Sequence, residues 1–87
     1  MPLVEDRVFK RQLRKLPAAI QAKVLERLNL LLADEFNSVL NNHKLHHPYE
    51  GYSSINITGD LRLVYKKIGP EAYYLRAVGT HHQLFGT

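Results

Sequence analysis

The stretch YSSINITGDLRLVYKKIGPEAYYLRAV, residues 52–78, decides the fold of this chain. β-Branched, aromatic and aliphatic residues dominate three runs within it, and residues that favour turns separate the runs. The runs cover residues 52–57, 61–67 and 72–78. Thr58-Gly59-Asp60 joins the first two runs, and Gly69-Pro70 lies between the second and the third. We therefore expect three consecutive antiparallel strands.

The connection between the first two strands determines which side chains share a face. A three-residue loop separates apolar from polar side chains most cleanly. The apolar face then carries Ile55, Ile57, Leu61, Leu63 and Tyr65. The opposite face carries Asn56, Arg62 and Lys66. If the apolar face packs against helices, the opposite face is an exposed surface with positive charge and polar groups.

The first half of the chain has the residue spacing of helices. Leu3-Val4 can form a short first strand, and Asp6 can cap a helix that ends before Pro17. Pro17 suits the first turn of a second helix, which runs to about Asp34. The apolar residues at helical spacing are Phe9, Leu13 and Leu16, then Ile20, Val24, Leu28, Leu31 and Leu32. Residues 37–52 have the composition of a loop with one helical turn. We expect a single α+β domain over residues 1–87, in which a helix hairpin packs on a small antiparallel sheet.

Charge and composition restrict the classes of function. Lys and Arg outnumber Asp and Glu by 12 to 8, so an anionic partner is favoured, either nucleic acid or an acidic protein segment. For the basic residues of the two helices a solvated surface is favoured over a binding role; they are Lys10, Arg11, Arg14, Lys15, Lys23 and Arg27. The chain has no cysteine, no visible export signal and no apolar run near the roughly 20 residues of a spanning helix. We therefore expect a cytoplasmic protein without a membrane segment.

All five histidines lie in the second half of the chain, and three explanations compete for them. They are His43, His46, His47, His81 and His82. A metal site is disfavoured because the two adjacent pairs lack the helical spacing of zinc ligands. For His46 and His47 the favoured interpretation is that they are polar loop residues with no catalytic or binding role. The third explanation is acid and base catalysis on RNA, in which one imidazole accepts the 2′-OH proton and another protonates the leaving 5′ oxygen.

Residues 42–86 show a specific resemblance to a known family. The strings NHKLHHPYEGYSSINITGDLRLVYK and LRAVGTHHQLFG resemble the YafQ-like branch of the RelE/ParE superfamily, toxins of type II toxin-antitoxin systems. The terminal Gly-Thr-His-x-x-Leu-Phe motif is the most distinctive element. The resemblance implies a RelE-like sandwich with a short C-terminal helical turn. It also implies a ribosome-dependent mRNA endonuclease that an antitoxin neutralises, with neither cofactor nor metal.

The resemblance assigns roles to particular residues. The motif-matched catalytic positions are His43, Asp60, His81 and Phe85. Phe85 could stack on an mRNA base or close the core, and Asp60 could orient a histidine or a base, or only form the turn. The expected RNA-binding residues are Arg62 and Lys66, which would hold phosphate, together with Asn56 and Arg76.

Three positions depart from the family pattern. Asn56 stands where these toxins often carry a histidine, and Leu61 stands where some carry a tryptophan. Ala77 replaces an arginine, and Arg76 is displaced from that position by one residue. Because neighbouring residues of a strand point to opposite faces, this displacement predicts that Arg76 does not substitute for the missing arginine.

The expected partners are a cognate antitoxin and mRNA on the ribosome, with DNA bound only through the antitoxin. The antitoxin is expected to cover the basic face with an acidic or amphipathic segment. Two alternatives remain open. One is a gyrase-poisoning, ParE-like toxin on the same scaffold, and the other is a catalytically decayed toxin that only binds its antitoxin.

Overall fold

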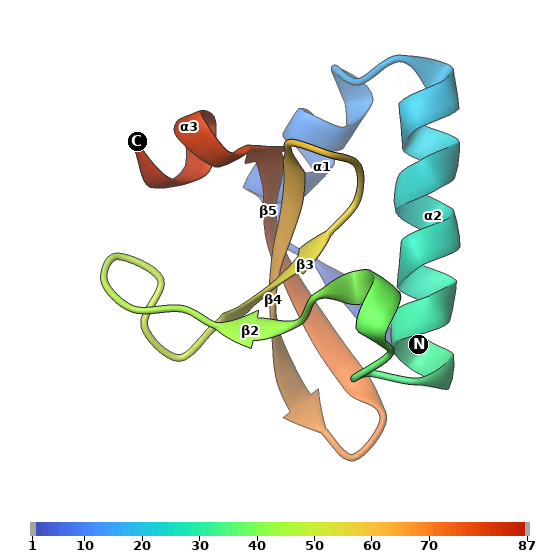
Figure 1. Cartoon of the computed structure of the whole chain (residues 1–87), viewed down its shortest axis with the longest axis vertical. Helices are drawn as coiled ribbons and strands as arrows, with labels where there is room; N and C mark the ends of the chain where they lie inside the picture. The colour runs from blue at the N-terminus through green and yellow to red at the C-terminus, as the bar shows by residue number, and fades with distance from the viewer. Residues whose placement is uncertain (1, 87) are drawn as a thin grey trace.

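The computed structural model describes residues 2–86, which form a mixed sheet with helices on both faces (Figure 1). The N-terminal part comprises β1 (Leu3–Glu5), α1 (Arg7–Arg14) and α2 (Ala18–Ala33). A 3-10 turn, η1 (Ser38–Leu40), leads into β2 (His43–Lys44), β3 (Ser53–Asn56), β4 (Leu61–Gly69), β5 (Ala72–Thr80) and α3 (His81–Phe85). The helix hairpin and the short C-terminal helix are confirmed. Within residues 2–86 no helix has both the length and the apolar character needed to cross a bilayer.

The sheet has five strands in the order β1-β5-β4-β3-β2, rather than three antiparallel ones. β1 pairs with β5 in parallel, and the other pairs are antiparallel. β1 and β2 have only three and two residues, too few for an alternating pattern to predict their place in a sheet. The predicted register of β3 and β4 is confirmed, because Ile55 pairs with Leu63, and the Ile57 amide donates to the Leu61 carbonyl at 2.9 Å.

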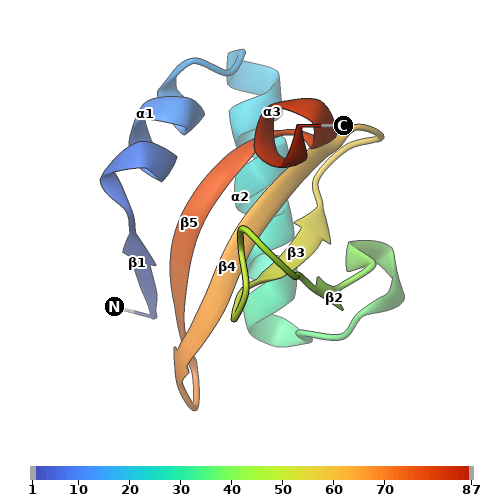
Figure 2. The same ribbon diagram turned by 90° about the vertical axis from the view of Figure 1, so that its left-hand side faces the viewer.

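α1 and α2 cover one face of the sheet and enclose the main core (Figures 1 and 2). Asp6 caps α1 by accepting the Val8 amide at 2.8 Å, and Pro17 precedes the first residue of α2. The core residues on the helix side include Phe9, Val24, Leu31, Ile55, Leu63 and Leu75. All of the apolar face predicted for β3 and β4 is buried there. This packing leaves the other sheet face, here called the far face, to carry the functional groups.

The far face is less exposed than the sequence predicted. Leu84 of α3 packs on Val64 and Ala77 in a second, smaller cluster. Leu45, Tyr49, Tyr52 and Phe85 border this cluster. The far face is therefore dry beneath α3 and open beside it, because α3 packs on Val64 and Ala77 from the end of the sheet at which β5 finishes (Figure 2).

A β-bulge in β5 changes the position of the displaced arginine. Val64 pairs with Ala77 and Tyr65 pairs with Leu75, so Arg76 is the extra residue. Tyr74 and Arg76 both contact Asp6, and the Lys66 ammonium lies over the Tyr74 ring. The prediction that a displacement by one residue reverses the face of Arg76 is wrong, since the bulge absorbs the displacement.

Candidate active site

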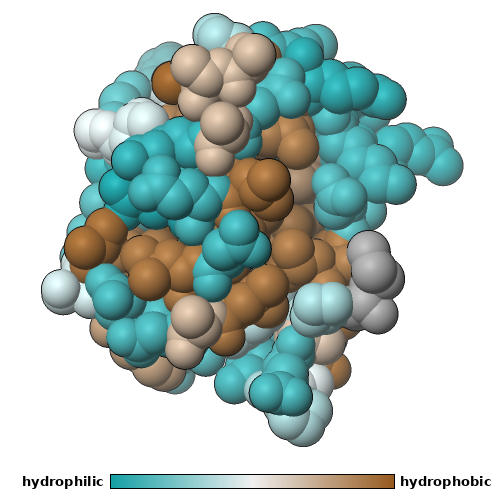
Figure 3. Space-filling view, turned by 90° about the vertical axis from the view of Figure 1, so that its right-hand side faces the viewer, coloured by the Kyte–Doolittle hydropathy of each residue, from teal (hydrophilic) through white to brown (hydrophobic). Residues whose placement is uncertain are grey.

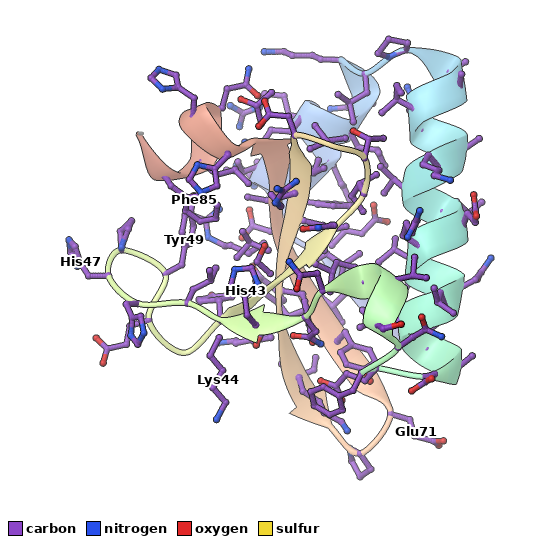
Figure 4. All side chains as sticks on the ribbon, viewed as in Figure 1. His43, Lys44, His47, Tyr49, Glu71 and Phe85 are labelled. Atoms are coloured by element: carbon purple, nitrogen blue, oxygen red, sulfur yellow. The ribbon has the colours of Figure 1, made fainter. Side chains whose placement is uncertain are left out.

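His43 lies on β2, at the margin of the far face. It pairs with Ser54, which in turn pairs with Val64. The imidazole is exposed, and its Nδ1 lies 3.0 Å from the carbonyl oxygen of Asn41. Figure 4 shows the His43 side chain between the sheet and the loop that carries His47 and Tyr49. The Asn41 carbonyl thus holds the His43 ring in place, and the ring remains accessible to a ligand.

A cationic hollow of about 410 Å³ adjoins His43. Its lining includes Lys44, Lys66 and Lys67 together with Asn42 and Tyr65. Glu35 also lines the hollow and pairs with Lys67 at 3.4 Å, so the positive charge left for the phosphates of a nucleic acid comes from Lys44 and Lys66. Of these lysines, the sequence singled out only Lys66.

Two tyrosine rings hold Lys66 in place. Its ammonium lies 5.2 Å from the ring centroid of Tyr52 and 5.7 Å from that of Tyr74. Tyr74 also donates a hydrogen bond to the Asp6 carboxylate. That hydrogen bond is the main reason that the pKa of Asp6 is lowered, and it raises the pKa of Tyr74. Such cation–π contacts restrict a flexible lysine to one edge of the far face.

The Gly-Thr-His segment builds the start of α3. A Cβ at position 79 would lie 3.0 Å from the Gln83 side-chain oxygen and 3.4 Å from the Leu84 side chain, so Gly79 leaves room for the close approach of α3. Thr80 caps the helix by accepting the Gln83 amide, and Gln83 accepts the Thr80 amide in return. His81 is therefore fixed as the first helical residue, with its ring centroid 4.8 Å from that of Phe85.

Asp60 and Arg62 lie at the same end of the sheet as His81. The His81 amide donates to the Asp60 carbonyl at 3.1 Å. Nη1 of Arg62 donates to the carbonyls of the β3–β4 turn, at residues 58, 59 and 61. A guanidinium has further N–H groups for a phosphate. Asn56 pairs with Arg62 across the strands, and its buried side-chain oxygen has no hydrogen-bond partner within residues 2–86.

The structure thus divides the predicted site residues into three groups. The first group lies at the α3 end and comprises His81, Phe85, Asp60, Arg62 and Asn56. The second group lies at the cationic hollow and comprises His43 and Lys66. Tyr49 joins the two groups, because its ring meets Phe85 at 5.8 Å and Tyr52 at 6.4 Å. Arg76 is separate from both groups, with its guanidinium 3.9 Å from Asp6.

Residues 2–86 match the family of bacterial toxins of type II toxin-antitoxin systems named for YafQ. The chain belongs to the YafQ family. It is therefore a type II toxin, the component that an antitoxin accompanies. Among curated proteins, no sequence matches the chain.

Solved structures show the same fold as this YafQ-family toxin. YafQ from Escherichia coli strain BL21(DE3) is 20% identical, with a TM-score of 0.80 and 97% of each chain covered. The YoeB/ParE toxin from Agrobacterium tumefaciens is 19% identical, with a TM-score of 0.77, covering 93% of this chain and 99% of the other. The toxin-antitoxin complex RelBE2 from Mycobacterium tuberculosis contains a chain that is 26% identical, with a TM-score of 0.70, covering 91% of this chain and 95% of the other.

Several neighbours of the site in this YafQ-family toxin were missed by sequence reasoning. They are Glu35, Lys44, Tyr49, Tyr52, Lys67 and Tyr74. The alternation of β3 places Tyr52 on the same face as Asn56, so that residue could have been found. Nothing in the sequence indicates that Lys44 and Lys67 approach one hollow. Among the described residues, no three histidine, aspartate or glutamate side chains are grouped as a metal would require.

Proposed function

We propose that this toxin cleaves mRNA on the ribosome, with His43 and His81 sharing the proton transfers. The observation that carries the proposal is the cationic hollow beside His43, at the β2 edge of the sheet. Tyr49 contacts Phe85 on one side and Tyr52 on the other, and the Tyr52 ring in turn contacts Lys66 of the hollow. The family assignment supports the same activity, because toxins of the YafQ and RelE type are endoribonucleases. The reaction would take place where translation occurs, in the cytoplasm.

The chemistry needs only the side chains of the protein. One imidazole removes the proton of a ribose 2′-OH, and that oxygen forms a new bond to the adjacent phosphorus. The bond from phosphorus to the 5′ oxygen breaks, and a second, protonated imidazole delivers its proton to that oxygen. Arg62 and the lysines of the hollow stabilise the negative charge of the phosphorane. Phe85 stacks on a neighbouring base, and Asn56 and Asp60 contact the nucleotide or the histidines beside it.

Adjacent histidines supply a matched test of this proposal. His81 and His82 are both exposed and belong to the same short helix. In a translation system, the wild type should cleave mRNA, and His81→Ala should lower the rate by roughly a hundredfold or more. His82→Ala should cleave at the wild-type rate. Equal cleavage by the wild type and His81→Ala would remove His81 from the mechanism.

We further propose that the cognate antitoxin occupies an apolar groove between β1, α1 and α2. The groove has a volume of about 350 Å³ and is lined by Leu3, Phe9, Leu13, Val24, Leu25 and Leu28, among others. Figure 3 shows apolar residues gathered on the α2 side of the molecule, where Leu25 is 59% exposed. An amphipathic segment suits an apolar groove, and its acidic residues would meet the basic residues in the last turn of α1, Arg11 and Arg14. The YafQ of E. coli forms a complex with DinJ, and this partner class is carried over to the present chain as part of the proposal.

The remaining alternatives give different results in the same experiments. A gyrase-poisoning toxin would arrest growth with DNA damage signals and without mRNA cleavage. A decayed toxin would bind its antitoxin without arresting growth. Expression of the chain with and without its neighbouring reading frame distinguishes a decayed toxin from an active one, because only an active toxin arrests growth that the neighbour then rescues.

A further inference from the structure

The chain just before His43 is held by a partly buried polar cluster that no catalytic assignment includes. We define the cluster as Glu35, Asn42 and Tyr65. The Asn42 side-chain amide donates to the Glu35 carbonyl oxygen at 2.9 Å and also to the Tyr65 hydroxyl. The Tyr65 hydroxyl donates to the Glu35 carboxylate at 3.1 Å. These bonds tie the loop after α2, the residue before β2 and strand β4 to one another.

The cluster is suited to hold its members firmly. The Tyr65 side chain is 1% exposed, and burial strongly raises the pKa of its hydroxyl, so this group remains a neutral donor. The Glu35 side chain is 18% exposed, and Lys67 lies 3.4 Å from its carboxylate. Tyr73 donates to the same carboxylate at 3.5 Å. A partly buried hydrogen-bond network with one fully buried member, Tyr65, holds the backbone that it touches in place.

The carbonyl that meets the His43 ring is that of Asn41, directly before the anchored Asn42. Asn41 adopts the left-handed conformation, with φ of 47°, at the end of η1. Its carbonyl oxygen lies 3.0 Å from Nδ1 of His43. A carbonyl can only accept a hydrogen bond, so Nδ1 must carry the proton. In the neutral ring, Nε2 then keeps its lone pair.

We propose that the cluster is a positioning device that holds His43 in the Nδ1–H tautomer and leaves Nε2 to accept the 2′-OH proton. The inference rests on the proposed RNA cleavage and refines it, because it assigns His43 the role of the base. Asn42 is then a positioning residue for His43 that acts through the Asn41 carbonyl. His81 supplies the proton to the leaving 5′ oxygen.

Nitrogen NMR of the imidazole rings tests the inference without RNA. The wild type should show a protonated Nδ1 and an unprotonated Nε2 for His43 at a pH where the ring is neutral, with the signals assigned by their loss in His43→Gln. In Asn42→Ala, both nitrogens should move toward the average of the two tautomers. Tyr65→Phe, which keeps the buried ring, should give a shift in the same direction. Asn29→Ala, an exposed change on α2, should leave the signals unchanged.

Cleavage provides a second measurement. Asn42→Ala should lower kcat by roughly tenfold with little change in KM, because the base is misoriented and the lysines of the hollow are intact. Its affinity for the antitoxin should stay at the wild-type value, which shows that the fold is retained. A protonated Nε2 with a bare Nδ1 in the wild type would overturn the inference, and so would unchanged NMR signals in Asn42→Ala. If the wild type cleaves no mRNA, the proposed function fails, and the NMR result still decides the tautomer.

Discussion

The rings of Tyr49 and Phe85 meet edge to face, with centroids 5.8 Å apart and planes at 90°. This contact joins the β2–β3 loop to α3, two segments that project on the same side of the sheet (Figures 1 and 4). Phe85 is half-buried and borders the cluster of Val64, Ala77 and Leu84. Its ring therefore contributes to packing in the free protein, beside the base-stacking role that we propose.

The first prediction concerns this ring pair. Tyr49→Ala should destabilise the protein by about 2 kcal/mol, because it removes an edge-to-face contact and part of the far-face cluster. Urea unfolding followed by circular dichroism measures the change. Tyr49→Phe keeps the ring and should stay within about 0.5 kcal/mol of the wild type. If Tyr49→Ala were as stable as the wild type, the contact would have no part in holding α3.

The second prediction concerns the cationic hollow. Lys44→Ala should weaken mRNA binding and lower cleavage by about fivefold, because a lysine that lines the hollow without an acidic partner among residues 2–86 is lost. The slope of binding against salt concentration should also become shallower. Lys10→Ala removes an exposed lysine of α1 and should change neither quantity. Equal losses in the two variants would indicate that net charge matters and the hollow does not.

The third prediction concerns the apolar groove. Leu25→Glu should weaken antitoxin binding by more than tenfold, since it places a charge in the groove and repels an acidic partner. Stability should change little, because the Leu25 side chain is 59% exposed. Val39→Glu provides the matched control, since Val39 is 53% exposed and lies outside the groove. Titration calorimetry with the antitoxin measures both affinities, and similar values for the two variants would contradict docking in the groove.

The fourth prediction concerns acid stability. The Tyr74 hydroxyl and the Val8 amide donate to Asp6 and lower its pKa below the ordinary value of 3.8. A carboxyl group with a lowered folded pKa stabilises the protein above its unfolded pKa, and this stabilisation is lost as the pH falls through the folded pKa. Thermal unfolding should therefore show a loss of stability below about pH 4. Asp6→Asn, which still caps α1, should make that loss smaller, and an unchanged acid profile would show that Asp6 is not responsible.

The sequence by itself determined the two main helices, the three long strands and the register of the first hairpin. The spacing of apolar residues located α1 and α2, and the three-residue connection at 58–60 correctly paired β3 with β4. The terminal Gly-Thr-His signal also had a local cause, since the glycine permits close approach and the threonine caps α3. These features depend on contacts between residues that are close along the chain, and a linear pattern can record such contacts.

Only the tertiary structure decided which side chains meet. β1 joins β5 in parallel across most of the chain length, and the bulge at Arg76 keeps that residue on the far face. The lysines of the hollow come from β2 and β4, and Glu35 reaches Tyr65 across a separation of 30 residues. Such contacts arise when the sheet closes on its helices, because packing brings together residues whose spacing along the sequence carries no shared period.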